Sequence, residues 1–238
     1  MAIMSKWTLS DLRNIEQAHV VLHLNYVGDN VLGIGYKTPS SNRPATYGNT
    51  LSLWEDSNNI PWTKDPTAVQ PIDEDCNNSS VLFAPESALT TTAYIVGYSL
   101  SPEKKDLCSL LKLKPTGNPG EPYSPIPSYT TLSLKNVGPD GRSFLVQYST
   151  LPGHEPSTNG AWIGLWDGNQ LPYESAGSLL AYHPVRRDSG HGVVPFNDVA
   201  LGIGRSYTLA YFTSGWSQDR SALQTTALAA TLGFQGPA

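Results

Sequence analysis

The densest group of side chains that could do chemistry is Tyr182–His191, which reads Y-H-P-V-R-R-D-S-G-H. His183, Asp188, Ser189 and His191 are the residue types of a hydrolase. A nucleophile, however, needs a base within hydrogen-bond reach that a third group orients, and two neighbours on a glycine-containing loop do not provide this. No G-x-S-x-G turn is present either. The favoured interpretation is a solvated loop with an Asp–Arg pair, and a hydrolase is the alternative.

The same loop carries the adjacent pair Arg186 and Arg187. A guanidinium group presents a planar fork of N–H donors that matches a carboxylate or another anion. The pair therefore suggests a further alternative, in which the loop binds an anion or a sugar acid.

Aromatic residues fall in or beside the expected turns, where they could anchor a sugar ring or a partner protein. The alternative is that most of them cap the ends of the fold. Trp216 is expected to be exposed because Ser214-Gly215 precede it and polar residues follow it. The predicted ligand-binding residues are Trp216, Trp62, Arg186, Arg187 and Tyr182, and the wider set is Tyr47, Trp62, Tyr123, Tyr173, Tyr182, Phe212 and Trp216.

Neither a metal site nor a cofactor site is predicted. Asp73-Glu74-Asp75 are consecutive and lack the spacing of a calcium loop. Cys76 and Cys108, the two cysteines of the chain, have no zinc-ligand spacing with the histidines. Two free thiols in a reducing compartment are favoured, and a Cys76–Cys108 disulfide is the alternative.

The elements that must position these residues come from an internal duplication. Gly160–Tyr173 (G-A-W-I-G-L-W-D-G-N-Q-L-P-Y) matches Gly48–Trp62 (G-N-T-L-S-L-W-E-D-S-N-N-I-P-W), since each strand ends on tryptophan and runs into an acidic turn. Further matches keep their order at spacings of 110, 112 and 113 residues, namely Leu22 with Leu132, Tyr36 with Tyr148, Phe83 with Phe196, and Tyr98 with Tyr211. We therefore expect two homologous units, each the size of a small domain.

The charge and hydropathy of the chain limit the classes of partner that it is expected to bind. The 238 residues carry a net charge of −5, with 9 basic and 12 acidic residues up to residue 118 and 6 and 8 after it. Neither half is basic, which argues against nucleic acid and against an anionic membrane surface. No apolar run reaches the ~20 residues of a membrane span. No signal peptide is visible, so the expected location at synthesis is cytoplasmic, with release by a non-classical route left open.

Glycine (21) and proline (19) are plentiful, as suits short strands and tight turns. About seven strands per unit predict an antiparallel β-sandwich, with Trp54 and Trp166 in the two cores. The expected domains are residues 19–114 and 129–238, joined by an extended, proline-rich linker at 115–128. Residues 1–18 are expected to form a polar arm with one helical turn. The last strand is expected within 221–232.

The strand Ala161–Trp166, followed by Tyr207–Tyr211, resembles immunoglobulin-like sandwiches of the SKICH type, which carry a W-[IV]-G-L-[FY] strand and a later Y-x-x-x-Y/F strand. The first unit departs from this pattern, because Thr50 replaces the tryptophan and Ser52 the glycine. The resemblance implies an all-β fold of two tandem antiparallel immunoglobulin-like β-sandwiches, and an interaction protein instead of an enzyme. A vaguer similarity is to the small β-rich partner components of bacterial two-component insecticidal toxins.

The sequence thus favours non-enzymatic recognition of a receptor, glycan or protein partner through loops at the ends of the sandwiches. The alternatives are the partner component of a bacterial two-component insecticidal, pore-forming toxin and a hydrolase that uses the loop Tyr182–His191.

Overall fold

The computed structural model describes residues 7–28, 30–40, 42–55, 57, 59–87, 89–139, 141–169, 173 and 178–236. Within them the chain forms antiparallel strands and three short 3-10 turns, so the predicted all-β class is confirmed. The first half contains β1 (Arg13–His19), β2 (Val21–Gly28), β3 (Val31–Lys37), β4 (Thr50–Glu55), β5 (Ala68–Pro71), β6 (Asn78–Phe83), β7 (Tyr94–Ser99) and β8 (Leu107–Asn118). The second half contains β9 (Glu121–Tyr129), β10 (Thr131–Val137), β11 (Phe144–Ser149), β12 (Trp162–Asp167), β13 (Leu179–Pro184), β14 (His191–Phe196), β15 (Ser206–Phe212) and β16 (Leu228–Gln235). The turns are η1 (Leu9–Asp11), η2 (Lys104–Asp106) and η3 (Arg220–Ala222).

The chain divides into two compact units. The N-unit consists of Val20–Thr130 together with Leu151–His154, and the C-unit consists of the described chain before Val20, Thr131–Thr150, and the chain from Glu155 onward. Each unit has a three-stranded and a five-stranded sheet. The orders are β2-β3-β6 and β5-β4-β7-β8-β9 in the N-unit, and β10-β11-β14 and β13-β12-β15-β16-β1 in the C-unit. Strand for strand, the two orders are equivalent.

Aromatic contacts join the two sheets of each unit. Tyr36 on β3 lies 5.6 Å from Tyr98 on β7 between ring centroids, and the equivalent pair, Tyr148 on β11 and Tyr211 on β15, is separated by 5.7 Å. All four rings are buried, as are Trp54 and Trp166, which were predicted to be core residues. The apolar faces of the two sheets therefore cover each other, which is compatible with β-sandwich architecture.

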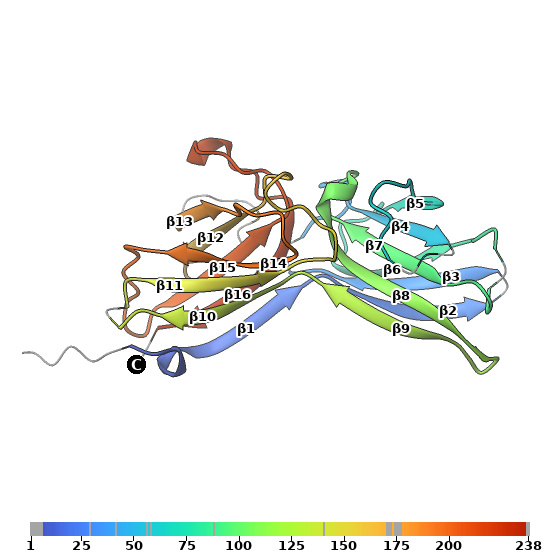
Figure 1. Ribbon diagram of the computed structural model, residues 1–238, viewed down its shortest axis with the longest axis horizontal. Helices are drawn as coiled ribbons and strands as arrows, with labels where there is room; N and C mark the ends of the chain where they lie inside the picture. Colours follow the sequence, from blue (N-terminus) through green and yellow to red (C-terminus); the bar gives the residue numbers. More distant parts are fainter. Residues whose placement is uncertain are drawn as a thin grey trace, which may run out of the picture. The chain divides into compact units, whose positions relative to one another are not determined.

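The two repeats exchange their first strands. β1 opens the first repeat but pairs with β16 in the C-unit, and β9 opens the second repeat but pairs with β8 in the N-unit. Figure 1 shows the blue β1 beside the red β16 and the green β9 along β8. A single buried residue, Val20 after β1 or Thr130 after β9, then leads into the next strand. Neither unit is therefore built from one repeat alone.

This exchange corrects the expected linker. Residues 115–128 are extended, as predicted, but they form the end of β8 and most of β9, and these two strands pair with each other. Pro122, Pro125 and Pro127 fit because they lie on β9, an edge strand that needs few of its backbone donors for the ladder. The linker prediction is wrong in this respect, since the segment belongs to the N-unit sheet.

The described part of the expected N-terminal arm also leads into a sheet, because residues 13–18 belong to β1; residues 1–6 lie outside the described residues. A helical turn is present at η1, where Thr8 and Asp11 form a capping box, and the chain then enters β1. The last strand was expected within 221–232; β16 begins there, after η3 and a loop, but extends beyond this range to Gln235. Strand β5 has only four residues and lies at a sheet edge, so it leaves little periodicity in the sequence.

Two further features accompany the fold. Cys76 and Cys108 are both free, which confirms the favoured prediction. In the part of the chain that the structure describes, no helix is both long and apolar enough to span a membrane.

Candidate recognition site

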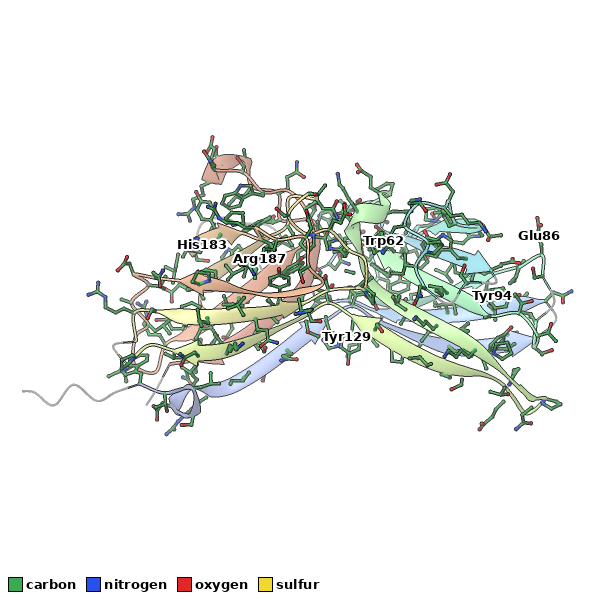
Figure 2. The ribbon with its side chains drawn as sticks, in the orientation of Figure 1. Trp62, Glu86, Tyr94, Tyr129, His183 and Arg187 are labelled. Atoms are coloured by element: carbon green, nitrogen blue, oxygen red, sulfur yellow. The ribbon has the colours of Figure 1, made fainter. Side chains whose placement is uncertain are left out.

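A hollow opens in the C-unit beside β13 and β14, the edge strands of its two sheets. Its volume is about 710 Å³, within the ~300–1,000 Å³ of typical ligand sites. His183 on β13, His191 on β14, Tyr148 on β11, and Arg186 and Arg187 from the intervening loop all line it. We call it the basic hollow, and Figure 2 labels His183 and Arg187 at it.

The positive charge of the basic hollow comes from its two arginines. Arg186 and Arg187 are exposed, and an arginine is protonated at any physiological pH. Burial, and to a lesser degree Arg186, lowers the pKa of His183, so this imidazole is neutral at pH 7. The ring of His183 packs edge-on against Phe196 at 4.8 Å, which fixes its orientation. The hollow therefore offers two fixed cations and a neutral imidazole.

Asp188 follows the arginines but has a structural task. The backbone N–H and the hydroxyl of Thr158 donate to its two carboxylate oxygens, each over 2.9 Å. The N-unit repeats this clamp, with Thr46 donating to Asp75 over 2.8 and 2.5 Å. Because this pair of hydrogen bonds recurs at equivalent positions, it belongs to the fold that the two units share. In the C-unit it engages the Asp188 carboxylate, which a catalytic triad would need.

Tyr148 and Gly192 shape the floor of the hollow. They are register partners on β11 and β14, and a Cβ at Gly192 would lie 2.4 Å from the Tyr148 hydroxyl. Glycine is therefore required for this hydroxyl to lie over β14. Burial raises the pKa of Tyr148, although the nearby Arg187 opposes the rise, so the phenol remains a neutral hydrogen-bonding group.

A second, open hollow of about 560 Å³ adjoins the first. Both are lined by Pro184, Val185 and Arg186, and the second is also lined by Trp216. Tyr182 lies beside this tryptophan, with ring centroids 5.6 Å apart and planes tilted by 49°. Both residues are half-buried, so the expectation that Trp216 is fully exposed is corrected. We call Tyr182 and Trp216 the aromatic shelf.

Backbone contacts hold the shelf in place. The Trp216 N–H donates to the Gly160 carbonyl at 3.0 Å, and the Tyr182 hydroxyl donates to the Gln218 carbonyl at 3.1 Å. Gly215 has φ +88° and lies so close to Gln224 that a Cβ would come within 2.5 Å. The loop that carries Trp216 therefore has a defined conformation that another residue at 215 would disturb.

Trp62 does not join this group. It lies in the N-unit, half-buried, where its indole N–H donates to the Pro152 carbonyl at 2.8 Å and its ring lies 5.7 Å from that of His154. Trp62 thus packs on the segment Leu151–His154. Leu151 of this segment belongs to a buried cluster that consists of Trp54, Ile60, Ile95, Leu107, Leu110 and Leu151. Trp62 therefore lies apart from the other predicted contact residues, whereas Tyr182, Arg186, Arg187 and Trp216 come together.

The groups of a hydrolase lie near one another without the required bonds. Ser189, His183 and His191 all line the basic hollow. In the described part of the chain, no hydrogen bond joins the Ser189 hydroxyl to either imidazole, and the hydroxyl instead lies 3.5 Å from the backbone N–H of His191. The described residues also include no cluster of three or more His, Cys, Asp or Glu side chains suited to a metal ion.

The N-unit has a hollow at the equivalent place, with the opposite charge. Its lining includes Tyr36, Gln70, Asp73 and Glu74, and its volume is about 350 Å³. In the repeat register, Asp73 and Glu74 correspond to Arg186 and Arg187 at a spacing of 113, and Tyr36 corresponds to Tyr148. We call it the acidic hollow. Two copies of one fold thus present opposite charges at one position.

The sequence alone does not show that Tyr148 and Gly192 line the basic hollow, or that Arg186 lines both hollows. The exchange of an acidic for a basic pair was visible at the repeat spacing. The other contributors lie on strands that only the sheet register brings together.

No protein-family model matches the chain, and no curated protein matches it significantly.

Proposed function

We propose that this protein recognises an anionic ligand, borne by a receptor, a glycan or a partner protein, at the basic hollow of the C-unit, and that it does so without catalysis. The observation that carries this proposal is the convergence of Arg186, Arg187 and Trp216 at two hollows that share one wall. An apolar platform beside convergent polar groups is the usual composition of a binding site.

The acidic hollow supports the proposal as an internal comparison. Because the two units share strand order and the Thr–Asp clamp, the fold alone does not require arginine at 186 or 187. The N-unit has the same strand order with Asp73 and Glu74 at the equivalent positions. Positive charge at this place is therefore a local property of the C-unit, as a site for an anion would need.

A finer fold assignment belongs to the same proposal. We assign each unit to the immunoglobulin-like sandwiches that the SKICH-type strands Ala161–Trp166 and Tyr207–Tyr211 resemble. Such sandwiches present loops at their ends and edges for binding, although fold by itself does not determine function.

The test is a binding screen with the intact protein on an array of acidic glycans, neutral glycans and acidic peptides. The decisive variant is Arg186→Asp/Arg187→Glu, which installs the N-unit residues in the C-unit. Losing two charge-assisted hydrogen bonds should cost about 3 kcal/mol, or roughly 100-fold in affinity. The matched control, Asp73→Asn/Glu74→Gln, changes the equivalent N-unit positions and should leave binding unchanged.

Undiminished binding by the arginine variant would refute the site, and a wild-type protein that binds no member of the array would refute the function. Turnover of a chromogenic ester or glycoside that His183→Ala abolishes would favour the hydrolase instead, since Ser189 and both histidines line the same hollow.

A further inference from the structure

The two hollows of the C-unit share part of their lining but differ in composition: the first contains both arginines and the second contains Trp216. The basic hollow has cationic and polar walls, and no carboxylate is among its described lining residues. The adjoining hollow adds Ser157, Trp216 and Gln218 to the lining. Arg186 lines both, so a ligand whose anionic group binds there extends directly towards the aromatic shelf.

The two rings of the aromatic shelf are not parallel to each other. Tyr182 packs beside Trp216 at a tilt of 49°, so the two rings do not form a parallel slot for a planar base. A sugar ring has an apolar C–H face that packs on a single indole, while its hydroxyls point outward from the edge of the ring. Ser157 and Gln218, two residues with hydrogen-bonding side chains, line the same hollow as Trp216.

We propose that the ligand is an acidic saccharide of at least two rings, with its anionic group at Arg186 and Arg187 and the next ring on the aromatic shelf. This inference rests on the proposed function and names its ligand class. The anionic group is a carboxylate or a sulfate on a sugar, since both match a pair of guanidinium groups. The open side of the second hollow leaves room for the saccharide chain to continue.

The test is calorimetric titration of the intact protein with three probes, namely galacturonate, the galacturonate tetrasaccharide and its methyl ester. The acidic tetrasaccharide should bind, and the ester should bind at least tenfold more weakly, because esterification removes the charge and keeps the rings. A sulfated galactose tetrasaccharide, titrated in parallel, distinguishes sulfate from carboxylate.

The Trp216→Ala variant separates the two subsites. It should weaken the tetrasaccharide roughly tenfold and change the monosaccharide less than twofold, because only the longer ligand reaches the shelf. Trp216→Phe should retain most of the affinity. Trp62→Ala is the matched control, since it removes a half-buried tryptophan from the other unit and should leave saccharide binding unchanged.

Equal losses for the monosaccharide and the tetrasaccharide, or no loss for either, would overturn the two-subsite arrangement. Tighter binding of an oligoglutamate peptide, dependent on Arg186 and Arg187 but not on Trp216, would overturn the saccharide and retain the proposed function. If Arg186→Asp/Arg187→Glu bound every probe like the wild type, both proposals would be refuted.

Discussion

Tyr98 and Tyr211 occupy equivalent positions in the two cores but differ in their partners. The Tyr98 hydroxyl donates to Asn49 at 2.9 Å, inside a network that also includes Asn42. In the repeat register Asn49 corresponds to Ala161, and the Tyr211 hydroxyl is buried without a hydrogen-bond partner among the described residues. Burial raises the pKa of Tyr211 far above that of a free phenol, so the group stays protonated. One substitution between the repeats thus leaves a buried hydroxyl that costs free energy.

Removing the tyrosine hydroxyl should therefore change the free energy of unfolding in opposite directions in the two units. Tyr98→Phe breaks a buried hydrogen bond and should lower the free energy of unfolding by about 1 kcal/mol. Tyr211→Phe removes an unpaired hydroxyl and should raise it by up to about 1 kcal/mol. Denaturant unfolding of the two variants checks this. Equal destabilisation by both would show that the Tyr211 hydroxyl has a partner.

His183 predicts a pH dependence of binding. Tyr148, Arg186, Arg187 and His191 line the same hollow, and burial followed by Arg186 lowers the pKa of His183. A bound anion would offset the arginines and raise this pKa, so the complex would hold more protons than the free protein. Affinity should then increase as the pH falls below about 6.5. An imidazole titration by NMR, with and without the acidic tetrasaccharide, measures it. An unchanged pKa at saturation would contradict the prediction.

The same group affects folding with a definite sign. Because the folded pKa of His183 is lowered, the unfolded chain binds the proton first as the pH drops. The contribution of His183 to stability is therefore present above the unfolded value of about 6.5 and decreases as the pH falls towards the folded pKa.

At the scale of elements, a short segment connects the second repeat to the first core. Leu151–His154 lies in sequence between β11 and β12 of the C-unit but belongs to the N-unit. Leu151 is 1% exposed and packs with Trp54 and Leu107, and His154 Nε2 lies 2.7 Å from the Lys105 carbonyl oxygen. Gly153, at φ +79°, lies where a Cβ would come 2.5 Å from the Trp62 indole nitrogen, so the segment fits closely.

Shortening the side chain of Leu151 should destabilise the N-unit, although the strands next to it in sequence belong to the C-unit. Leu151→Ala leaves a cavity and should cost about 2–5 kcal/mol. Native-state hydrogen exchange should locate the loss on β7 and β8. Leu232→Ala, at a fully buried leucine of β16, is the control and should instead weaken protection of β15 and β16. Faster exchange of β12 and β15 in Leu151→Ala would contradict the assignment.

At the scale of the whole molecule, the exchanged strands make each unit depend on both repeats. The C-unit takes β1 from the first repeat, and the N-unit takes β9 and Leu151–His154 from the second. The repeats meet at the exposed β8–β9 turn, between Asn118 and Glu121. A break in the chain there leaves every strand pair intact.

A protease site inserted into this turn should therefore produce a cut protein that stays together. After cleavage of the full chain, the two fragments should co-elute in gel filtration without denaturant, because separation requires the loss of both β1–β16 and β8–β9 pairing. Adding Ala18→Pro removes a backbone donor from β1 and should lower the urea concentration at which the fragments separate. Fragments that separate in plain buffer would contradict the exchange.

The internal repeat and the alternation of apolar and polar residues were enough to predict part of this fold from the sequence. Two copies of one strand plan, the burial of Trp54 and Trp166, and the all-β class follow from local patterns that burial on one face imposes. The basic pair and the aromatic residues of the C-unit were recognisable by residue type. The tertiary structure alone decided that Trp62 packs in another unit, that β1 and β9 change places, and that Gly192 admits the Tyr148 hydroxyl beside the arginines. The reason is physical: strand pairing is non-local, and a sheet edge accepts any strand with a matching pattern, so the choice of partner depends on the assembled fold.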